Sequence, residues 1–363
     1  MFLTRHEIER NIDWLLANAS DAVKYLTHKH LLQTDPGSEA MQALWSRVAQ
    51  GPEAAELLSK QHEDGSWFSG GPWGPQGYRR QALPGYTASR PKFVTTAWLL
   101  PYLGEMGFTV GDPRIHHGAD YLMANTDLPD PVIDEGGVTS NCCGLYATPL
   151  RAFASIGMAS DPRLEGRWDR LLRCQREDGG WLNPNHLADS PTPSTTQGRW
   201  PWDRSCAWGT YYATEALWHS HIPEYQEALQ RAIGFLLWHL SQKDPAEIQT
   251  WVYHGHNMVK ELLMTSEAGI DMTTPPVQAL LTWLRRYYKP EEAVFRTQEK
   301  PIGSFTRHVS AIVKDYEATL GSGYWDSVAK VSAPVLRYHL YHLVEDDWLT
   351  YYLTRIAINA QCN

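Results

Sequence analysis

Two short segments of the 363-residue chain are near copies of each other. Gln61-His-Glu-Asp-Gly-Ser-Trp67 matches Gln175-Arg-Glu-Asp-Gly-Gly-Trp181, and Asp134-Glu-Gly-Gly-Val138 is a degraded third copy. Another pair of similar segments, Gly107-Phe-Thr-Val-Gly-Asp-Pro-Arg114 and Gly157-Met-Ala-Ser-Asp-Pro-Arg163, lies between them. Self-similarity at intervals of roughly 40–60 residues is typical of repeat architectures. The chain is therefore predicted to fold as copies of one supersecondary unit.

The stretches between the repeated segments predict helices, because period-2 alternation is scarce and glycines follow several apolar runs. The first helix of each predicted pair is more apolar and the second is more charged, which is typical of an inner and an outer ring of helices. The predicted pairs are 21–32 with 52–61, 95–107 with 114–125, 143–157 with 162–175, 206–219 with 225–240, 256–269 with 275–288, and 324–344 with 348–360.

Six such hairpins predict an all-α fold, an (α/α)6 toroid of repeated helical hairpins around a central cavity. The linkers richest in Gly, Pro, Ser and Thr, residues 70–90 and 188–198, fall between hairpins and do not separate domains. Residues 1–363 are therefore predicted to form a single toroid domain.

Composition limits the classes of partner. The formal net charge of −9, with no compensating basic run, argues against nucleic-acid binding. No apolar stretch of about 18 residues predicts a transmembrane helix, and the charged N-terminus does not resemble a secretory signal. Five cysteines, an odd number, indicate reduced thiols and a cytoplasmic location. The 16 Trp and 18 Tyr supply rings for core packing or for a cavity lining.

The pattern Gln-x-x-Asp-Gly-(Ser/Gly)-Trp after an outer helix resembles the QW-type repeat of the squalene and terpenoid cyclase and protein prenyltransferase superfamily. The resemblance implies a structural role for the repeat. Its Gln is expected to bond the end of the following inner helix, its Gly to make the turn, and its Trp to pack between hairpins. The motif supports the fold and says little about chemistry.

In that superfamily, residues at the start of the inner helices point into one mouth of the cavity. The corresponding positions here carry hydroxyls, thiols, a carboxylate and imidazoles. They are Thr95, Thr96, Cys142, Cys143, Asp203, Cys206, His254 and His256.

The resemblance implies acid–base cyclisation, isomerisation or dehydration of an isoprenoid or other hydrophobic substrate, with Asp203 as acid or base. Cys206, Cys143, His254 or His256 would assist, because a helix N-terminus or a nearby imidazolium lowers a thiol pKa. Arg204 could pair with Asp203 and hold it ionised. Aromatic faces stabilise carbocations by about 0.5–2 kcal/mol. The predicted substrate-binding residues are Trp200, Trp202, Trp208, Tyr211, Tyr212, Thr95 and Thr96.

This sequence lacks the Asp-x-Asp-Asp acid motif of the polyene cyclases and the Asp-Asp-x-x-Asp motif for diphosphate ionisation. Glu345-Asp346-Asp347 instead predicts a solvated helix start, since acidic residues favour that end of a helix.

Two alternatives to the acid–base enzyme are left open. The first is a zinc-dependent prenyltransferase-like or lyase enzyme, because farnesyltransferase-like subunits hold Zn²⁺ with an Asp, a Cys and a His. Asp203, Cys206 and His256 match these residue types, although two residues separate Asp from Cys here instead of one. The second is a toroid that binds a hydrophobic ligand, or acts as a scaffold, without catalysis.

Overall fold

The computed structural model describes residues 2–67, 90–126, 133–134, 137–138, 143–181, 205, 207–242, 258–296 and 345–362. Side chains are placed for these residues except 90–95, 133–134, 137–138, 143–146, 208 and 362. The described chain is mostly helical and essentially all-α, as predicted.

Four predicted pairs appear as consecutive helices. They are α5 (Arg90–Glu105) with α6 (Pro113–Ala124), α7 (Cys143–Ser155) with α8 (Glu165–Arg173), α9 (Ala207–Ser220) with α10 (Gln226–Ser241), and α12 (Met258–Glu267) with α13 (Pro275–Leu284). Short 3-10 turns, η2 (Pro162–Leu164), η5 (Pro223–Tyr225) and η8 (Arg285–Tyr287), flank α8, α10 and α13.

Glycines end the first helices where the sequence predicted. Gly107, Gly157 and Gly269 follow α5, α7 and α12 with φ angles of 105°, 84° and 70°. Residues with a Cβ rarely adopt this left-handed conformation, so glycine is the common helix stop.

The N-terminal region holds more helix than predicted. It contains α1 (Arg5–Asn18), α2 (Asp21–Leu26), a π-helix η1 (Thr27–Leu31), α3 (Glu39–Gln50) and α4 (Pro52–Ser59). α1 and α3 were not predicted. α1 begins with a capping box, in which Thr4 Oγ1 accepts the Glu7 N–H and Glu7 Oε2 accepts the Thr4 N–H.

Two short antiparallel ladders, also not predicted, interrupt the helices. β1 (Ile133–Asp134) pairs with β2 (Gly137–Val138), and β3 (Tyr288–Lys289) pairs with β4 (Val294–Phe295). The first ladder occupies the degraded third copy of the repeated segment. Each is too short to alter the fold class.

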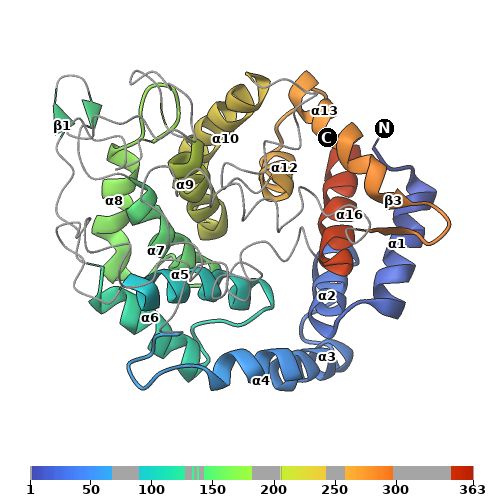
Figure 1. Cartoon of the computed structure of the whole chain (residues 1–363), viewed down its shortest axis with the longest axis horizontal. Coiled ribbons are helices and arrows are strands. Elements are labelled where there is room, and N and C mark those ends of the chain that lie inside the picture. The colour runs from blue at the N-terminus through green and yellow to red at the C-terminus, as the bar shows by residue number, and fades with distance from the viewer. Residues whose placement is uncertain are drawn as a thin grey trace, which may run out of the picture.

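The first helices of successive pairs pack against one another. α7 contacts both α5 and α9, and α12 contacts α9. α16 (Asp346–Cys362), predicted as the second helix of its pair, instead contacts the first helices α12 and α2. In Figure 1 the described helices follow one another around the view in chain order, and the two chain ends lie side by side. Gln361 Nε2 donates to Leu3 O at 3.0 Å, and α16 contacts α1. The predicted partner of α16, residues 324–344, lies outside the described residues.

The two near-identical segments form the same contacts. Trp67 N donates to Thr96 Oγ1 at 3.0 Å, and its Nε1 donates to Leu57 O at 2.9 Å. In the second segment, Trp181 N donates to Thr210 Oγ1 at 2.9 Å and its Nε1 donates to Leu171 O at 2.8 Å. The sequence separations between donor and acceptor are the same in both segments. Both indoles are fully buried between a helix that precedes the segment and one that follows it, as predicted.

The expected contact of the glutamine was wrong. Gln61 Nε2 donates to Arg114 O in the first turn of α6, and Gln175 Nε2 donates to Ala228 O in the first turn of α10, both at 2.8 Å. The amide therefore bonds the second helix of the next pair and not its first helix. Each glutamine also holds its own turn, through Gly65 O or Gly179 O.

The predicted helix start at Asp346 is confirmed, but its acidic side chains are engaged in contacts. Asp347 Oδ2 accepts the Ser20 N–H at 2.9 Å, and Asp346 Oδ2 pairs with Arg296 Nη1 at 2.9 Å. These two carboxylates join α16 to the N-terminal helices and to the β4 region.

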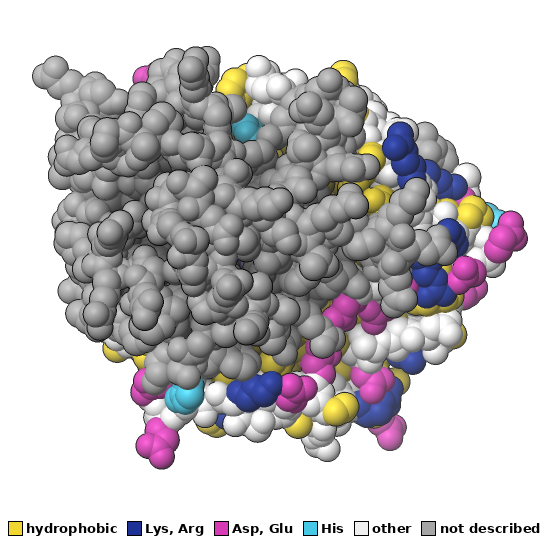
Figure 2. All heavy atoms as spheres, viewed as in Figure 1, with side chains coloured by type: hydrophobic (Ala, Val, Ile, Leu, Met, Phe, Trp, Pro, Cys, Tyr) yellow, Lys and Arg dark blue, Asp and Glu magenta, His cyan; other side chains and the backbone are white. Residues whose placement is uncertain are grey.

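Charged side chains are also exposed at the surface of the molecule. Figure 2 shows acidic and basic side chains interspersed along the lower rim, over α3 and α4. Among the described helices, none has the length and apolarity needed to cross a membrane.

Candidate functional site: a buried ion cluster

Five helices each contribute a polar side chain to one buried cluster. These side chains are Glu105 on α5, Arg151 on α7, Glu215 on α9, Lys260 on α12 and Tyr352 on α16. His219, one turn after Glu215 on α9, completes the group. We call these six residues the ion cluster.

Lys260 lies at the centre of the ion cluster. Its ammonium donates to Glu215 Oε1 at 2.8 Å and also to Glu105 Oε1. The side chain thus links α12 to α5 and α9 inside the protein. An ammonium with three donors suits this bridging position between two carboxylates.

Arg151 holds the other oxygen of Glu215. Its Nη1 donates to Glu215 Oε2 at 2.9 Å, its Nη2 donates to Ala97 O at 3.4 Å, and its guanidinium lies 4.9 Å from the centre of the Tyr212 ring. Glu215 is fully buried and each of its oxygens faces a cation. Such pairing is what a buried charge requires, because an unpaired one costs several kcal/mol.

The pairings set the charges of the cluster. Burial alone would raise the pKa of Glu215, but Arg151 and Lys260 hold that pKa well below its usual range. Burial acts to lower the pKa of Lys260, and Glu105 and Glu215 more than offset it, so the pKa is raised. Glu215 is therefore a carboxylate and Lys260 an ammonium at neutral pH.

Tyr352 remains a neutral phenol. Burial and the neighbouring Glu105 carboxylate raise its pKa well above the usual value. Its hydroxyl donates to Glu105 Oε2. Glu105 is thereby held from two sides, by the Tyr352 phenol and the Lys260 ammonium.

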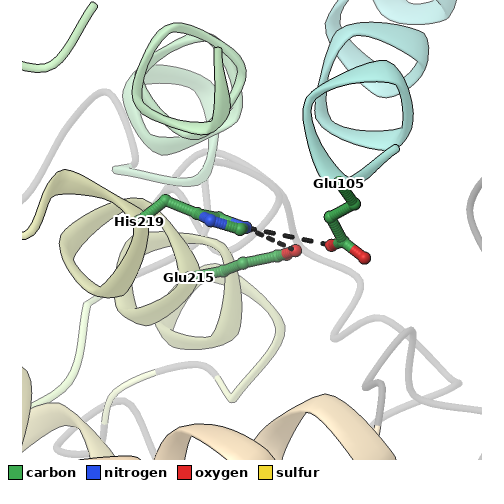
Figure 3. A group of neighbouring side chains, drawn as sticks. All are labelled: Glu105, Glu215 and His219. Carbon is green, nitrogen blue, oxygen red and sulfur yellow. Dashed lines mark ion pairs between the residues drawn. The ribbon is translucent and has the colours of Figure 1, made fainter. Parts of the chain in front are cut away.

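His219 faces the carboxylates at the edge of the cluster (Figure 3). Its Nε2 lies 3.8 Å from Glu215 Oε1 and 3.9 Å from Glu105 Oε1. Both distances exceed a hydrogen bond, and this nitrogen has no hydrogen-bond partner within the described part of the chain. The His219 and Glu105 side chains are 12% and 9% exposed, against 5% or less for Arg151, Glu215 and Lys260.

Glu105, Glu215 and His219 could hold a metal ion, because one ligand atom from each lies within 4.8 Å of the others. Two carboxylates and an imidazole suit several divalent metals. However, the Lys260 ammonium already bonds both carboxylates. A divalent cation at this position would have to displace or face that ammonium, so the observed arrangement favours an ion-pair network.

Most residues of the site predicted from sequence lie outside the described part. These are Cys142, Trp200, Trp202, Asp203, Arg204, Cys206, His254 and His256. Thr95, Cys143 and Trp208 belong to α5, α7 and α9, and the structure describes their backbone but not their side chains. Their roles stay predictions.

Three predicted substrate-binding residues are described. Thr96 is fully buried, and its hydroxyl accepts the Trp67 N–H. Tyr211 and Tyr212 are buried with ring centres 5.4 Å apart, and Tyr212 lies against Arg151. Tyr212 thus connects the predicted aromatic residues to the ion cluster, while a contact of these side chains with substrate stays a prediction.

Sequence reasoning missed the ion cluster. The available signal was a charged residue inside an apolar helix, as in Tyr211-Tyr-Ala-Thr-Glu-Ala-Leu-Trp-His219. Acidic and basic residues are almost never fully buried unless they are paired. Glu215 and Lys260 within apolar helices therefore indicated buried partners, without identifying them.

The chain matches no protein-family model, and no curated protein matches it at a significant level.

Proposed function

We propose that this chain is an acid–base enzyme that cyclises, isomerises or dehydrates an isoprenoid or similar hydrophobic substrate. We further propose that its helices close into an (α/α)6 toroid of the terpenoid-cyclase and prenyltransferase type. The packing series α5, α7, α9, α12, α16 and α2 supports this arrangement, which a contact of α2 with α5 would close. In the proposed ring, α16 is the sixth inner helix and α1 its outer partner. The proposed location is the cytoplasm.

One observation carries the enzymatic proposal: the imidazole of His219 lies beside two buried carboxylates and has no hydrogen-bond partner among the described residues. Histidine is the side chain that gains and loses protons near neutral pH, and general acid–base catalysis uses it most often. A histidine with a purely structural role usually has hydrogen bonds that hold its ring. His219 and Glu105 are the most exposed side chains of the ion cluster, at 12% and 9%, although His219 Nε2 itself is buried, so we place the substrate at this edge.

Dehydration illustrates the proposed roles. Protonated His219 donates a proton to the substrate hydroxyl, the C–O bond breaks, and water leaves. The Glu105 carboxylate removes a proton from the neighbouring carbon, and the electron pair of that C–H bond forms the alkene. Glu105 then returns its proton to His219 through the released water molecule, because 3.9 Å between the two groups is too long for a direct transfer. Protonation of an alkene by the same group would begin an isomerisation or cyclisation.

Lys260, Arg151 and Tyr352 support this chemistry without transferring protons. They balance the charge of Glu215 and fix Glu105. Preorganised polar groups of this kind are a main source of catalytic power. The aromatic side chains Tyr212, Trp218 and Tyr352 beside the cluster suit a carbocation.

The test is a conversion assay with geraniol, linalool, farnesol and their diphosphates, with products identified by gas chromatography and mass spectrometry. The wild-type protein is expected to convert at least one of them, and His219→Gln to lower the rate by about 10²–10⁴-fold. His6→Gln, on the exposed face of α1, is the matched control and should keep full activity. A folded wild-type protein that converts none of these compounds, or an unchanged rate in His219→Gln, would overturn the proposal.

Zinc-assisted chemistry remains the second candidate, supported by the residue types at Asp203, Cys206 and His256. A non-catalytic toroid that binds a hydrophobic ligand is the third. This binder would keep its ligand affinity in Asp203→Asn and His219→Gln, whereas an enzyme would lose turnover in the variant that removes its catalytic group.

A further inference from the structure

A second group of basic side chains lies close to the ion cluster but outside it. Lys29 and His30 belong to the π-helix η1, His221 directly follows α9, and Arg355 lies on α16. α16 packs against η1, which brings these segments together. We call these four residues the basic group.

The backbone around the basic group is unusual. π-helices are rare and often occur at functional sites. His221 and Gln33, just beyond η1, both have φ angles of 51°, a left-handed conformation that side chains seldom adopt. Such strain costs of order 1–3 kcal/mol and clusters at binding sites.

The four basic residues act on one another electrostatically. Burial, with Arg355, Lys29 and His221, lowers the pKa of His30 to about 3. Burial and Arg355 lower the pKa of Lys29, and burial and His219 lower the pKa of His221. At neutral pH both imidazoles are therefore neutral, and the two cations of the group are Lys29 and Arg355.

The carboxylate that the described structure places beside this group is already engaged. Glu267, the last residue of α12, pairs with Arg355, and its Oε2 accepts the Trp218 Nε1–H at 2.9 Å. Among the described residues, this one carboxylate therefore faces two cations, Lys29 and Arg355. Lys29 and His221 are exposed, so an anion from solution can reach them.

We propose that Lys29, His30, His221 and Arg355 form a binding site for a phosphate or diphosphate group. Ammonium, guanidinium and imidazole nitrogens are the donors that bind such groups, through short charge-assisted hydrogen bonds. Binding would relieve the repulsion among the basic side chains and favour the protonated form of His30.

The site lies next to the proposed catalytic group. The Trp218 ring centre lies 4.4 Å from that of His219, and Trp218 also bonds Glu267. A phosphorylated isoprenoid bound at Lys29 and Arg355 would therefore extend toward Glu105 and His219. This assignment of the anion as a substrate headgroup rests on the proposed function, whereas the anion site itself does not.

The experiment is calorimetric titration of the full chain with inorganic pyrophosphate at fixed ionic strength, using the wild type, Lys29→Gln and Lys29→Gln/His221→Asn. Lys60→Gln removes one exposed positive charge from the end of α4 and is the control. We expect saturable binding to the wild type and to the control. Lys29→Gln should weaken the binding about tenfold or more, through the loss of a charge-assisted hydrogen bond.

Absence of saturable binding to the wild type, or equal affinities in all four proteins, would overturn the site. Because pyrophosphate binding needs no turnover, either result is distinct from a failure of the proposed function. A titration with geranyl diphosphate and geraniol identifies the source of the anion. Tighter binding of geranyl diphosphate than of pyrophosphate assigns the site to a substrate headgroup, and equal binding assigns it to a free phosphate ligand.

Discussion

The Lys260 ammonium lies 2.8 Å from Glu215 Oε1 in the protein interior, where the Glu215 side chain is fully buried. This pair joins α12 to α9 and forms the centre of a network that continues to Glu105 and Arg151. Because the pair is buried, its loss should lower the free energy of unfolding strongly. A buried charge that loses its partner costs far more than an exposed one.

Lys260→Met is therefore expected to lower the free energy of unfolding by about 3–5 kcal/mol, because it removes a partner from two buried carboxylates. The measurement is urea denaturation followed by circular dichroism. Lys60→Met is the matched control, since the Lys60–Glu56 pair at the protein surface should contribute less than about 1 kcal/mol. Equal losses in the two variants would contradict the account of the ion cluster.

Substitution of the turn glycine should lower stability by a similar amount in each of the two similar segments. Gly65 and Gly179 have φ angles of 84° and 87°, and an added Cβ would lie 2.3 Å from a backbone oxygen in each case. Alanine at either position is expected to cost about 2–4 kcal/mol of stability.

Gly234→Ala in α10 is the control for these substitutions, because a Cβ there meets no atom within 4 Å. It should stabilise the protein by up to about 1 kcal/mol through higher helix propensity. Thermal melting of the three variants distinguishes these effects. A large difference between Gly65→Ala and Gly179→Ala would contradict the equivalence of the two segments.

His30 should make stability depend on pH. Its pKa falls from the model-compound value of 6.5 to about 3 in the folded protein, so the unfolded chain binds the proton more tightly. Its contribution is fully present above pH 6.5 and is lost as pH falls toward 3. Between pH 7 and pH 5 this loss amounts to about 2 kcal/mol.

Chemical denaturation at pH 7 and pH 5 measures this contribution as the difference between wild type and His30→Gln. The variant should lose about 2 kcal/mol less than the wild type over this interval. A stability loss of the same size in both proteins would show that burial and the basic neighbours do not hold His30 neutral.

The metal content of the purified protein distinguishes the two places where a metal could bind. Since Lys260 bonds both carboxylates, we expect His219→Gln to leave the zinc content of the wild type unchanged. Any zinc present should instead be lost in Cys206→Ala and His256→Ala. Elemental mass spectrometry without chelators in the preparation gives the answer, and zinc lost specifically in His219→Gln would place the metal in the ion cluster.

Much of the helical framework could be predicted, because local signals determine it. Pro113 and Pro275 mark helix starts, and Gly107, Gly157 and Gly269 mark helix ends. α1 and α3 were missed, since they lie outside the repeated segments from which the pairs were built. Their N-capping residues, Thr4 and Ser38, nevertheless mark the starts of these two helices in the sequence.

The ion cluster could not be predicted in the same way, because its contacts are far apart in sequence. Lys260 and Glu105 are separated by 155 residues, and Lys260 and Glu215 by 45. A lone charge within an apolar helix requires a buried partner, but it does not identify that partner. The residues at the predicted cavity mouth, such as Asp203, lie outside the described part. The experiment that follows therefore compares a variant of that predicted site with a variant of the ion cluster.

The most direct test of the proposed acid–base function is transfer of a solvent proton to carbon. We would incubate the wild type, His219→Gln and Asp203→Asn with the isoprenoid alcohols and diphosphates in D₂O, and measure deuterium in recovered substrate and product by mass spectrometry. The account predicts that the wild type incorporates deuterium at carbon in at least one compound and that His219→Gln loses this incorporation. Absence of deuterium from every compound with folded wild-type protein would contradict the account, as would full incorporation by His219→Gln.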